Sequence, residues 1–590
     1  MVVEKIKNKA SAFANWLTGM RAKCSASKHA NVMVCSVFTI SIFLQCILFH
    51  KLVYGTFAYS LCDGPSLIIR LSIGLFIASF CFLTKRKFWL IVVSLITAFW
   101  SMAELIYYRA NSIFIEEYSL TMADNMNGVW DSIWVFNEIQ DWLLLLPTLV
   151  VGVVVWMYAS PTRKMKPFFV TLLLSVALNC WSTHQIHILV ACPHDVCEHR
   201  WYDIMNPFAK NGDVTYLGFT TEHYMEYVSV LHSFVFQIKD LVMLPFADGQ
   251  YQMTAEDESQ ASHFVQTDSI VEKPQPATPL IIVLVESFES WTITPETTPN
   301  LCKFIDETSS ILYANLMHPQ VRHGVSGDGQ MIVNTGLLPI TDGAACFRFP
   351  SNVYPALSHL YQNPGLIAAS SLSFWNQKFM SKSYGIKQNY VVEAIDDKIT
   401  FEKYRSLKKE HDFLMVLTMG THAPFDNSPE YTYPMVEGMP TKIYDYLNSV
   451  KYMDKQLNML LEDIKNDPAI QSSTVVITAD HSGLGLSLRT EFEEFDKERQ
   501  LPFEEINGCI PFLVYSPLIK EKTIISDPIC QMDIYPTLLH LLGCESYYWK
   551  GLGVDLMVHK SWKNRPIPLA EAQLLSDKII RSNYFEGIKK

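Results

Sequence analysis

The sequence is poor in charged residues. Only 18% of its 590 residues are Asp, Glu, Lys or Arg, whereas 49% are hydrophobic, and soluble domains usually carry a larger charged share. With a formal net charge of −12, the chain lacks the basic excess of a nucleic-acid-binding protein. Its 13 cysteines include no pair of CxxC motifs, which argues against a zinc finger or zinc ribbon. A low charge content leaves a surplus of apolar residues that a single soluble core does not account for.

Apolar runs absorb this surplus, and they gather in the first third of the chain. Arg70 lies near one end of the second run, from which its long side chain is expected to snorkel toward water, and Glu104 lies late in the third run. One such run can be the buried helix of a soluble core, but five in succession predict a transmembrane domain over residues 1–192. The predicted spans cover about residues 31–50, 66–84, 88–108, 142–160 and 167–191.

Lysine and arginine are concentrated in three of the segments that flank these runs. They are the N-terminal segment up to Lys28, the link 85–87 and the link 163–166. All three fall on one side of the membrane if every run spans it, and the positive-inside rule makes that side cytoplasmic. The sequence therefore predicts a multi-pass protein of the plasma (inner) membrane, with everything after about residue 192 outside the cytoplasm.

Two features of the outer side leave alternatives open. Residues 109–141 mix aromatic and acidic residues, which fits either an amphipathic helix on the outer leaflet or an ordinary loop. Cys192 and Cys197 lie on the face where disulfides persist, so they form either a local bridge or two free thiols.

The composition changes again after the last run. Residues 193–277 predict an extracytoplasmic linker, and the stretch 255–279 is rich in Glu, Ser, Gln, Thr and Pro, as flexible linkers are. From residue 278 to residue 590, short runs rich in β-branched residues alternate with helical patterns such as 444–463, which predicts an α/β domain with a mostly parallel sheet. The predicted strands are residues 280–285, 413–418, 474–478 and 511–515.

Polar side chains follow three of these strands at the point where each strand ends. Glu286 comes directly after the first strand, His422 follows the second, and Asp480 and His481 follow the third. Each has a simpler explanation as a helix cap or surface residue, and Ser326, which stands before an apolar run, fits a helix N-cap. Because parallel strands end at one edge of the sheet, however, these groups are expected to converge. Carboxylate oxygens and imidazole nitrogens suit Mn²⁺ or Zn²⁺, and a serine hydroxyl bound to such an ion becomes a nucleophile.

The order of these motifs resembles that of a known superfamily. Val-Glu-Ser at 285–287, Gly-Val-Ser-Gly-Asp-Gly at 324–329, Thr-His-Ala-Pro-Phe at 421–425 and Ala-Asp-His at 479–481 are similar to the sulfatase-like branch of the alkaline phosphatase superfamily. Five spans followed by an outward enzyme domain, together with Ser-Phe-Trp-Asn at 373–376, resemble the lipoteichoic acid synthase family of phosphoglycerol transferases.

This resemblance implies roles for the residues at the strand ends. Glu286, Asp480 and His481 would be ligands of one divalent metal ion, with Mn²⁺ expected first and Zn²⁺ or Mg²⁺ as alternatives. Ser326 would be both the fourth ligand and the nucleophile, at a position where the family usually has threonine. His422 would stabilise the phosphoryl oxygens or carry a proton to the leaving group.

The resemblance also implies a head-group pocket, and here the sequence departs from the family. Trp375 and Asn376 would line this pocket, and Lys378, His323 and Arg322 are further candidates for phosphate contacts. Family members that make polyglycerol phosphate have histidine, aspartate and arginine at positions where this chain has Ala368, Ser370 and Gln377. The phosphoglycerol pocket is therefore not reproduced, and the sequence leaves the donor head group undecided.

Together these features predict a membrane-anchored, metal-dependent phosphotransferase. It would move a head-group phosphate of phosphoglycerol type from a phospholipid donor, through a covalent Ser326 intermediate, to a lipid or glycan acceptor outside the plasma membrane. A phosphoethanolamine transferase, or a sulfatase-type or phosphodiesterase-type hydrolase of the same fold, is the alternative among enzymes. A non-catalytic membrane sensor or scaffold is the alternative from another class.

Overall fold

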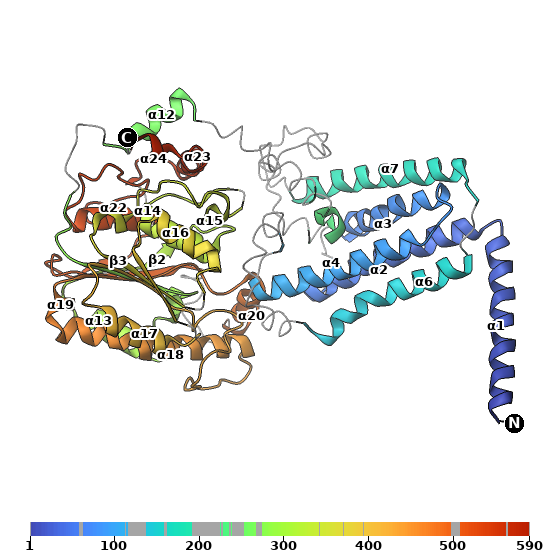
Figure 1. Ribbon diagram of the computed structural model, residues 1–590, viewed down its shortest axis with the longest axis horizontal. Coiled ribbons are helices and arrows are strands. Elements are labelled where there is room, and N and C mark those ends of the chain that lie inside the picture. Colours follow the sequence, from blue (N-terminus) through green and yellow to red (C-terminus); the bar gives the residue numbers. More distant parts are fainter. Residues whose placement is uncertain are drawn as a thin grey trace. The chain divides into compact units, whose positions relative to one another are not determined.

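The chain forms two compact units, residues 1–117 with 130–244 and residues 118–129 with 245–590 (Figure 1). The computed structural model describes residues 2–57, 63–111, 114–115, 137–158, 162–190, 225, 228–234, 238, 253–266, 274–341, 343–369, 371–392, 395–496, 508–561 and 564–588. Most of residues 109–141, together with Cys192, Cys197 and Ser370, lie outside these ranges.

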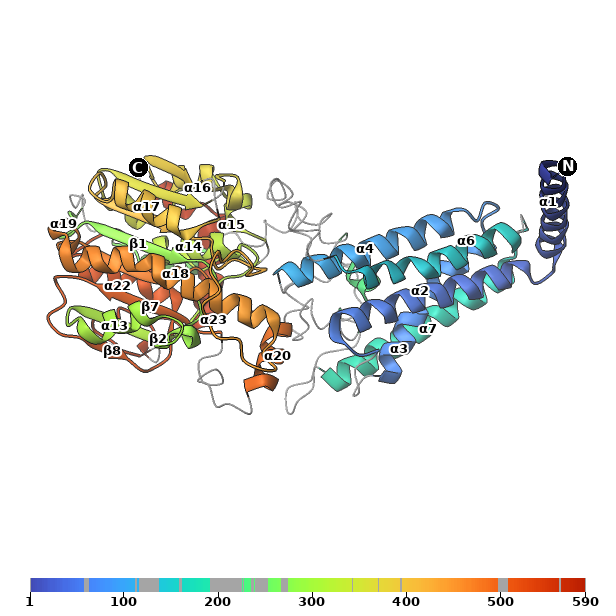
Figure 2. The same ribbon diagram turned by 90° about the horizontal axis from the view of Figure 1, so that it is seen from below.

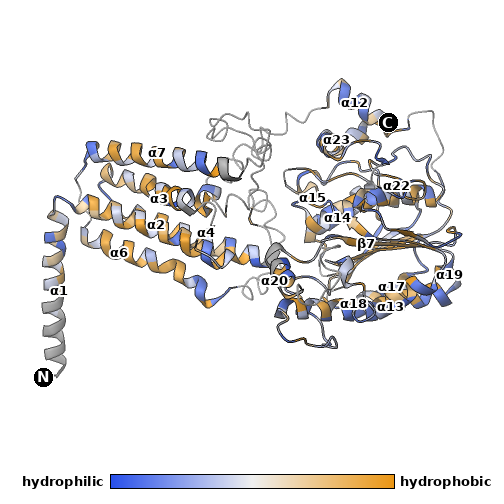
Figure 3. Cartoon of the chain, turned by 180° about the vertical axis from the view of Figure 1, so that it is seen from behind, coloured by the Kyte–Doolittle hydropathy of each residue, from blue (hydrophilic) through white to orange (hydrophobic). Residues whose placement is uncertain are grey.

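Five helical segments of the first unit are long and apolar enough to cross a membrane, as predicted. Apolar residues cover much of their outer surface (Figure 3); Leu149 and Leu173, for example, are 64% and 67% exposed. A continuous apolar outer surface of this kind on a helix bundle is typical of contact with lipid. The candidate spans are Ala30–Tyr54 (α2), Gly64–Phe82 (most of α3, Asp63–Ser79, with a short 3₁₀ turn), Trp89–Arg109 (within α4, Trp89–Asn111), Ile139–Tyr158 (a 3₁₀ turn and α6, Leu146–Tyr158) and Met165–Ile186 (within α7, Met165–Val190).

Polar side chains and close backbone approaches hold the spans together. The Gln45 amide of α2 donates to the hydroxyls of Ser94 in α4 and Thr148 in α6, at 3.2 and 2.9 Å. Gly74 of α3 lies so close to α2 that a Cβ would come within 2.9 Å of the Thr39 carbonyl oxygen. Such contacts matter because lipid provides little hydrophobic force between spans.

The position of Arg70 differs from the prediction. Its side chain is fully buried, with 0% of its surface exposed, rather than extended toward water. α3 packs against α2 and α7, and Arg70 lies on the side of α3 that faces the bundle, whereas Phe76 is 39% exposed. The hydropathy of a span does not determine which of its sides meets its neighbours, so snorkelling could not be predicted from the position of Arg70 along the run.

A helix that the sequence analysis did not predict precedes the first span. This helix, α1 (Val2–Ala26), crosses the direction of the spans at a steep angle in both ribbon views (Figures 1 and 2).

The second unit is built on a mostly parallel sheet, as predicted, and the sheet has nine strands in the described part of the chain. Its strand order is β4-β3-β5-β1-β6-β7-β2-β8, with β9 paired to β2. β1 lies between β5 and β6 and is buried along its whole length, and β7 is antiparallel to both of its neighbours. The strands are β1 Leu280–Val285, β2 Ile311–His318, β3 Pro364–Ala369, β4 Gln388–Val392, β5 Phe413–Leu417, β6 Thr474–Ala479, β7 Ile510–Tyr515, β8 Thr523–Ile525 and β9 Ile529–Cys530.

Helices cover both faces of this sheet (Figure 1). One face carries α13 (Pro299–Glu307), α17 (Asp397–Leu407) and α18 (Thr441–Asn466), and the other carries α14 (Val325–Thr335), α16 (Gln377–Ser383) and α22 (Ile534–Leu541). The three-layer arrangement explains why the strands read as continuous apolar runs.

Part of the predicted flexible linker is an ordered piece of this unit. Residues Ala255–Ser262 form the helix α12, whose first turn is capped by a reciprocal pair of hydrogen bonds between Thr254 and Asp257. Phe264 and Val265, which are 8% and 5% exposed, belong to the main hydrophobic core. The polar composition of this stretch did not indicate a helix, because α12 is stabilised by only these few apolar contacts and by a capping box. Residues 267–273 lie outside the described part of the chain.

Candidate active site

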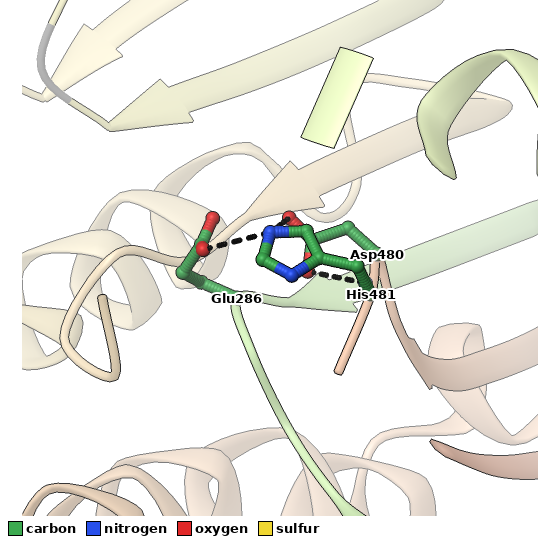
Figure 4. Close-up of side chains that lie close together, drawn as sticks. All are labelled: Glu286, Asp480 and His481. Carbon is green, nitrogen blue, oxygen red and sulfur yellow. Dashed lines mark hydrogen bonds and ion pairs between the residues drawn. The ribbon is translucent and has the colours of Figure 1, made fainter. Parts of the chain in front are cut away.

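The register of two central strands brings the predicted metal ligands together. Val285, the last residue of β1, pairs with Ala479, the last residue of β6. The residues that follow them just beyond the two strand ends are Glu286 and Asp480, respectively. Both side chains are buried. Glu286, Asp480 and His481 each offer one ligand atom, and these three atoms lie within 4.8 Å of one another (Figure 4). The group has the donor types and the spacing of a metal site.

Hydrogen bonds with the backbone orient the side chains of Asp480 and His481. Asp480 Oδ1 accepts from the backbone N–H groups of Ser287 and His481, at 3.0 and 2.8 Å, so that Oδ2 faces the His481 ring. His481 Nδ1 lies 2.7 Å from the Ser482 carbonyl oxygen, which makes Nδ1 the donor and directs Nε2 toward the carboxylates. His481 Nε2 lies 3.2 Å from Glu286 Oε1 and 3.6 Å from Asp480 Oδ2.

Charge and burial act strongly on these groups. Burial opposes protonation of His481, but Asp480 and Glu286 outweigh it and raise the pKa of the imidazole to about 10. Burial and the Glu286 charge raise the pKa of Asp480 to about 7. Burial alone would raise the pKa of Glu286, yet the neighbouring His481 lowers it. The two carboxylates thus draw a positive charge into the site, which is the electrostatic condition for holding a cation.

Ser326 lies at the same edge of the sheet. Its Oγ is 3.3 Å from Glu286 Oε2 and 3.2 Å from His481 Nε2. It is not the helix N-cap, because α14 begins at Val325 and its N-cap is Gly324. Val325 has a φ of +36°, a strained value for a β-branched residue, and it immediately precedes the serine.

A buried carboxylate shapes the loop that presents Ser326. Asp328 Oδ2 accepts from the backbone N–H groups of Arg322 and Gly324, both at 2.9 Å. Asp328 is 1% exposed, and burial raises its pKa to about 6.

The turn that carries His422 follows β5, on the other side of β1. Asp397 Oδ1 accepts from the backbone N–H groups of Met419 and Gly420, at 3.2 and 3.0 Å, and the Thr421 hydroxyl donates to the Glu286 carbonyl oxygen. His422 is not part of the three-residue metal group, but it lies close enough for its charge to lower the pKa of Glu286.

The structure separates the candidate head-group residues. Trp375 lies against the start of α14, since a Cβ on Gly327 would be 3.1 Å from Trp375 Cβ. The Asn376 amide donates to the Cys346 carbonyl oxygen at 2.8 Å, so it stabilises the turn that presents Trp375. Lys378 is exposed on α16, and within the described part of the chain no hydrogen bond or ion pair joins it to the metal group.

The two candidates before the nucleophile are also placed differently from each other. Arg322 is exposed, and its Nε donates to Gln573 Oε1 at 3.3 Å. His323 is partly buried, and its charge lowers the pKa of Asp328. The charge of Arg322 lowers the same pKa, so both side chains lie near the loop that presents Ser326.

One buried residue of the site was missed by the sequence analysis. Glu289 has no exposed surface, and its Oε1 accepts from the backbone N–H groups of Gly483 and Leu484, both at 2.8 Å. It also pairs with Arg489 at 2.5 Å, and Trp291 Nε1 donates to its Oε2 at 2.8 Å. Glu289 therefore fixes the loop that follows His481. Its only signal in the sequence is a second carboxylate three residues after Glu286.

Backbone strain is concentrated around the site. Six described residues other than glycine have a positive φ, and only Asn583 is remote from the motifs discussed above. The other five are Ser287, Val325, Trp375, Asn376 and Phe425. Strain of this kind persists where the surrounding structure positions functional groups.

The fold and the site define a class of protein. A carboxylate–imidazole group and a helix-borne serine at the carboxyl edge of a mostly parallel sheet, joined to five apolar helices, define a membrane-anchored enzyme of the alkaline phosphatase and sulfatase fold. Family comparison agrees for both parts: the Sulfatase family matches residues 348–544, and the Lipoteichoic acid synthase N-terminal domain matches residues 20–189. The chain belongs to the lipoteichoic acid synthase-like members of the alkaline phosphatase superfamily.

Similarity to individual proteins is low but extends over much of the chain. Lipoteichoic acid synthase 1 of Bacillus subtilis (strain 168) is 20% identical over 503 residues, which are 80% of this chain and 76% of that protein. The lipoteichoic acid synthase-like protein YvgJ of the same organism is 24% identical over 308 residues, so the chain matches about half of its length, 49%. The crystal structure of the lipoteichoic acid synthase LtaP from Listeria monocytogenes has 21% sequence identity and a TM-score of 0.41, and covers 52% of this chain and 82% of that one.

Proposed function

We propose that this protein transfers a head-group phosphate of phosphoglycerol type from a membrane phospholipid to a hydroxyl group of a lipid or glycan acceptor. The observation that carries the proposal is the position of Ser326 Oγ, within 3.3 Å of both Glu286 and His481. A hydroxyl in this position is a nucleophile if a metal ion lies between the ligands. A phosphoglycerol-type head group is supported by the resemblance of the sequence motifs to phosphoglycerol transferases and by relatives that are named lipoteichoic acid synthases.

The residues of the site fit one divalent metal ion, with Mn²⁺ as our first choice. Glu286 and Asp480 would supply oxygens, His481 would supply Nε2, and Ser326 Oγ would be the fourth ligand. The fit rests on the outer contacts: His481 Nδ1 and Asp480 Oδ1 are both engaged by the backbone, so the opposite atoms of the two side chains are left for the ion, as in other metal sites. A bound ion would favour the serine alkoxide and neutralise charge on the phosphoryl group.

The residues of the chain then carry out the reaction in two halves. Ser326 Oγ, having lost its proton to solvent, attacks the lipid phosphorus; a Ser–O–P bond forms and the P–O bond to diacylglycerol breaks. His422 gives a proton to the departing diacylglycerol oxygen. In the second half, the acceptor hydroxyl gives its proton to His422 and attacks the phosphorus, and Ser326 Oγ departs.

The head-group positions of the family pattern hold uncharged residues in this chain. Ala368 is buried in β3, and the buried Gln377 donates its amide to Ser381 Oγ at 3.2 Å. Neither residue offers the charge that would hold phosphoglycerol in the family manner. We therefore assign head-group contact to Trp375, with Lys378, His323 and Arg322 as further candidates for phosphate contact, and keep phosphoethanolamine as the alternative head group.

The proposed location is the outer side of the plasma membrane. The three basic segments meet at one end of the spans: Lys164 Nζ donates to the Lys28 carbonyl oxygen at 2.6 Å, and Lys164 N donates to Phe82 O at 2.9 Å. The positive-inside rule makes that end cytoplasmic, with residues 1–192 as the anchor and the unit that includes α12 and the nine-stranded sheet as the catalytic domain. A reporter fused to residue 590 should be active only outside the cytoplasm, and cytoplasmic activity would overturn this orientation.

The decisive experiment is mass spectrometry of the serine adduct. The full-length protein with Mn²⁺ is mixed separately with phosphatidylglycerol and phosphatidylethanolamine, quenched in acid and digested. We expect an adduct on Ser326 whose mass identifies the head group, no adduct in Ser326→Ala, and a normal adduct in Ser472→Ala, an exposed serine remote from the motifs. Absence of any adduct with intact metal binding would favour a sensor, and an adduct resolved only by water would favour a hydrolase.

A further inference from the structure

The N-terminal helix α1 has the sequence of an amphipathic helix. Apolar residues recur at intervals of three or four positions, which places them on one side of a helix. The series is Val3, Ile6, Ala10, Phe13, Leu17, Met20 and Cys24. Between Val2 and Ala26 the basic residues are Lys5, Lys7, Lys9, Arg21 and Lys23, and the only acidic residue is Glu4.

The basic positions border the apolar side. At 100° per residue, Lys5, Lys9 and Lys23 fall along one border of the apolar stripe, and Lys7 and Arg21 fall along the other. This pattern is typical of helices that lie in a membrane surface, where long cationic side chains reach the head groups from both borders of the apolar stripe.

The packing of α1 places it across the end of the spans. It contacts α6, and the Arg21 guanidinium lies 5.4 Å from the centre of the Trp156 ring. Both ribbon views show α1 crossing the direction of the spans rather than continuing it (Figures 1 and 2). Trp16, on the same side of the helix as Met20, is 59% exposed.

Aromatic and basic residues mark this end as a head-group layer. Trp156 and Tyr158 lie in the last turn of α6, and Trp89 begins α4. Tryptophan and tyrosine gather where a membrane meets water. The basic segments that meet through Lys28 and Lys164 lie at the same end. A helix that crosses the spans at this level lies in the plane of the membrane surface.

We infer that α1 lies flat on this surface and binds anionic phospholipid through Lys5, Lys7, Lys9, Arg21 and Lys23. The partner is the lipid surface rather than a second copy of the chain, because two such helices facing each other would bring their basic borders together. Under the topology proposed above, this surface is the cytoplasmic leaflet. The inference is independent of the reaction at Ser326.

Hydrogen–deuterium exchange of the full-length protein in nanodiscs tests this assignment. The discs contain phosphatidylcholine alone, phosphatidylcholine with phosphatidylglycerol, or phosphatidylcholine with phosphatidylserine. We expect amides of residues 3–20 to exchange several-fold more slowly in both anionic discs, and the difference to shrink in high salt. Phosphatidylserine separates attraction to charge from recognition of a donor lipid, because it is anionic without carrying phosphoglycerol.

Charge-matched variants give the control. The triple substitution Lys5→Gln, Lys7→Gln and Lys9→Gln should abolish the slowing while leaving exchange in α2 and α4 unchanged. The triple substitution of the exposed Lys398, Lys520 and Lys560 by Gln removes the same amount of charge from the second unit. This control variant should keep the slow exchange of α1 in anionic discs. Equal exchange in neutral and anionic discs, or slowing that survives the α1 substitutions, would overturn the inference. Slowing that depends on protein concentration would instead assign the surface to a second copy.

Discussion

Gly329 of α14 lies directly against the backbone of Asp480. A Cβ at position 329 would come within 2.4 Å of the Asp480 carbonyl oxygen, a distance that real Cβ atoms do not reach without movement of the backbone. The absence of a side chain at position 329 thus lets the start of α14, which carries Ser326, rest on the strand end that carries Asp480 and His481.

The first prediction follows from this contact. Gly329→Ala should move the start of α14 away from β6 and lower the rate of Ser326 adduct formation by about a hundredfold, the cost of a misplacement of about 1 Å. Single-turnover kinetics with a phospholipid donor measure this rate. The control is Gly587→Ala, because a Cβ there meets nothing within 4 Å; unchanged kinetics in Gly329→Ala would mean that the contact does not position Ser326.

Removing the charge of Glu289 should weaken metal binding without unfolding the domain. Glu289 holds Gly483 and Leu484 just beyond His481, and loss of such outer contacts typically lowers metal affinity by about 10-fold to 100-fold. Calorimetric titration of the Glu289→Gln variant with Mn²⁺ should show this loss of affinity. The variant Glu521→Gln, which changes an exposed residue, should bind Mn²⁺ as the wild type does. Wild-type affinity in Glu289→Gln would contradict the role assigned to this residue.

Asp397 should give the folded protein a distinct dependence on pH. Burial raises its pKa to about 6, above the value near 3.9 of an unfolded chain. The folded state therefore binds a proton more tightly, so this contribution to stability is complete below about pH 4 and is lost as the pH rises through about 6.

The isosteric substitution Asp397→Asn removes this titration. Asn retains an oxygen that accepts from the Met419 and Gly420 N–H groups. Its NH₂ group takes the place of Oδ2, which has no hydrogen-bond partner among the described residues. The fall in the free energy of unfolding between pH 4 and pH 6 should become smaller by on the order of 2 kcal/mol. Denaturant titrations across this pH range measure it, with the exposed Asp527→Asn as the control; an identical pH profile in Asp397→Asn would refute the assignment.

Trp375 should contribute more to substrate binding than to the metal site. Its Cβ packs against Gly327, which follows Ser326 in the sequence. Among the described residues, no hydrogen bond or ring contact joins Trp375 to Glu286, Asp480 or His481. Trp375→Ala should raise KM for the lipid donor by about twofold to tenfold, since an aromatic contact is worth about 0.5–1.5 kcal/mol beyond its buried area and about 1.4 kcal/mol corresponds to tenfold; Mn²⁺ affinity should not change. Phe379→Ala, which truncates an aromatic residue that is 55% exposed, should leave both quantities unaltered.

The sequence alone determined the parts of this protein that depend on local pattern. Span-length apolar runs placed the five membrane helices, and β-branched runs placed the central strands. The strand ends located Glu286, Asp480 and His481, because parallel strands necessarily end at one edge of a sheet. Local pattern also contained α1, as apolar residues three and four apart, but its five basic residues distinguish it from the span-length apolar runs.

The tertiary structure decided whatever depends on contact between distant segments. Arg70 is buried because the side of α3 that carries it faces α2 and α7. Residues 255–265 are ordered because Phe264 and Val265 enter a core that is built mainly from later segments. The environment of Ser326 required β1, β6 and α14 to meet, and this meeting depends on Gly329 and on the buried carboxylates of Asp328 and Glu289. No local pattern encodes these contacts, since the energy that fixes them arises from burial and hydrogen bonding between residues that lie far apart in the chain.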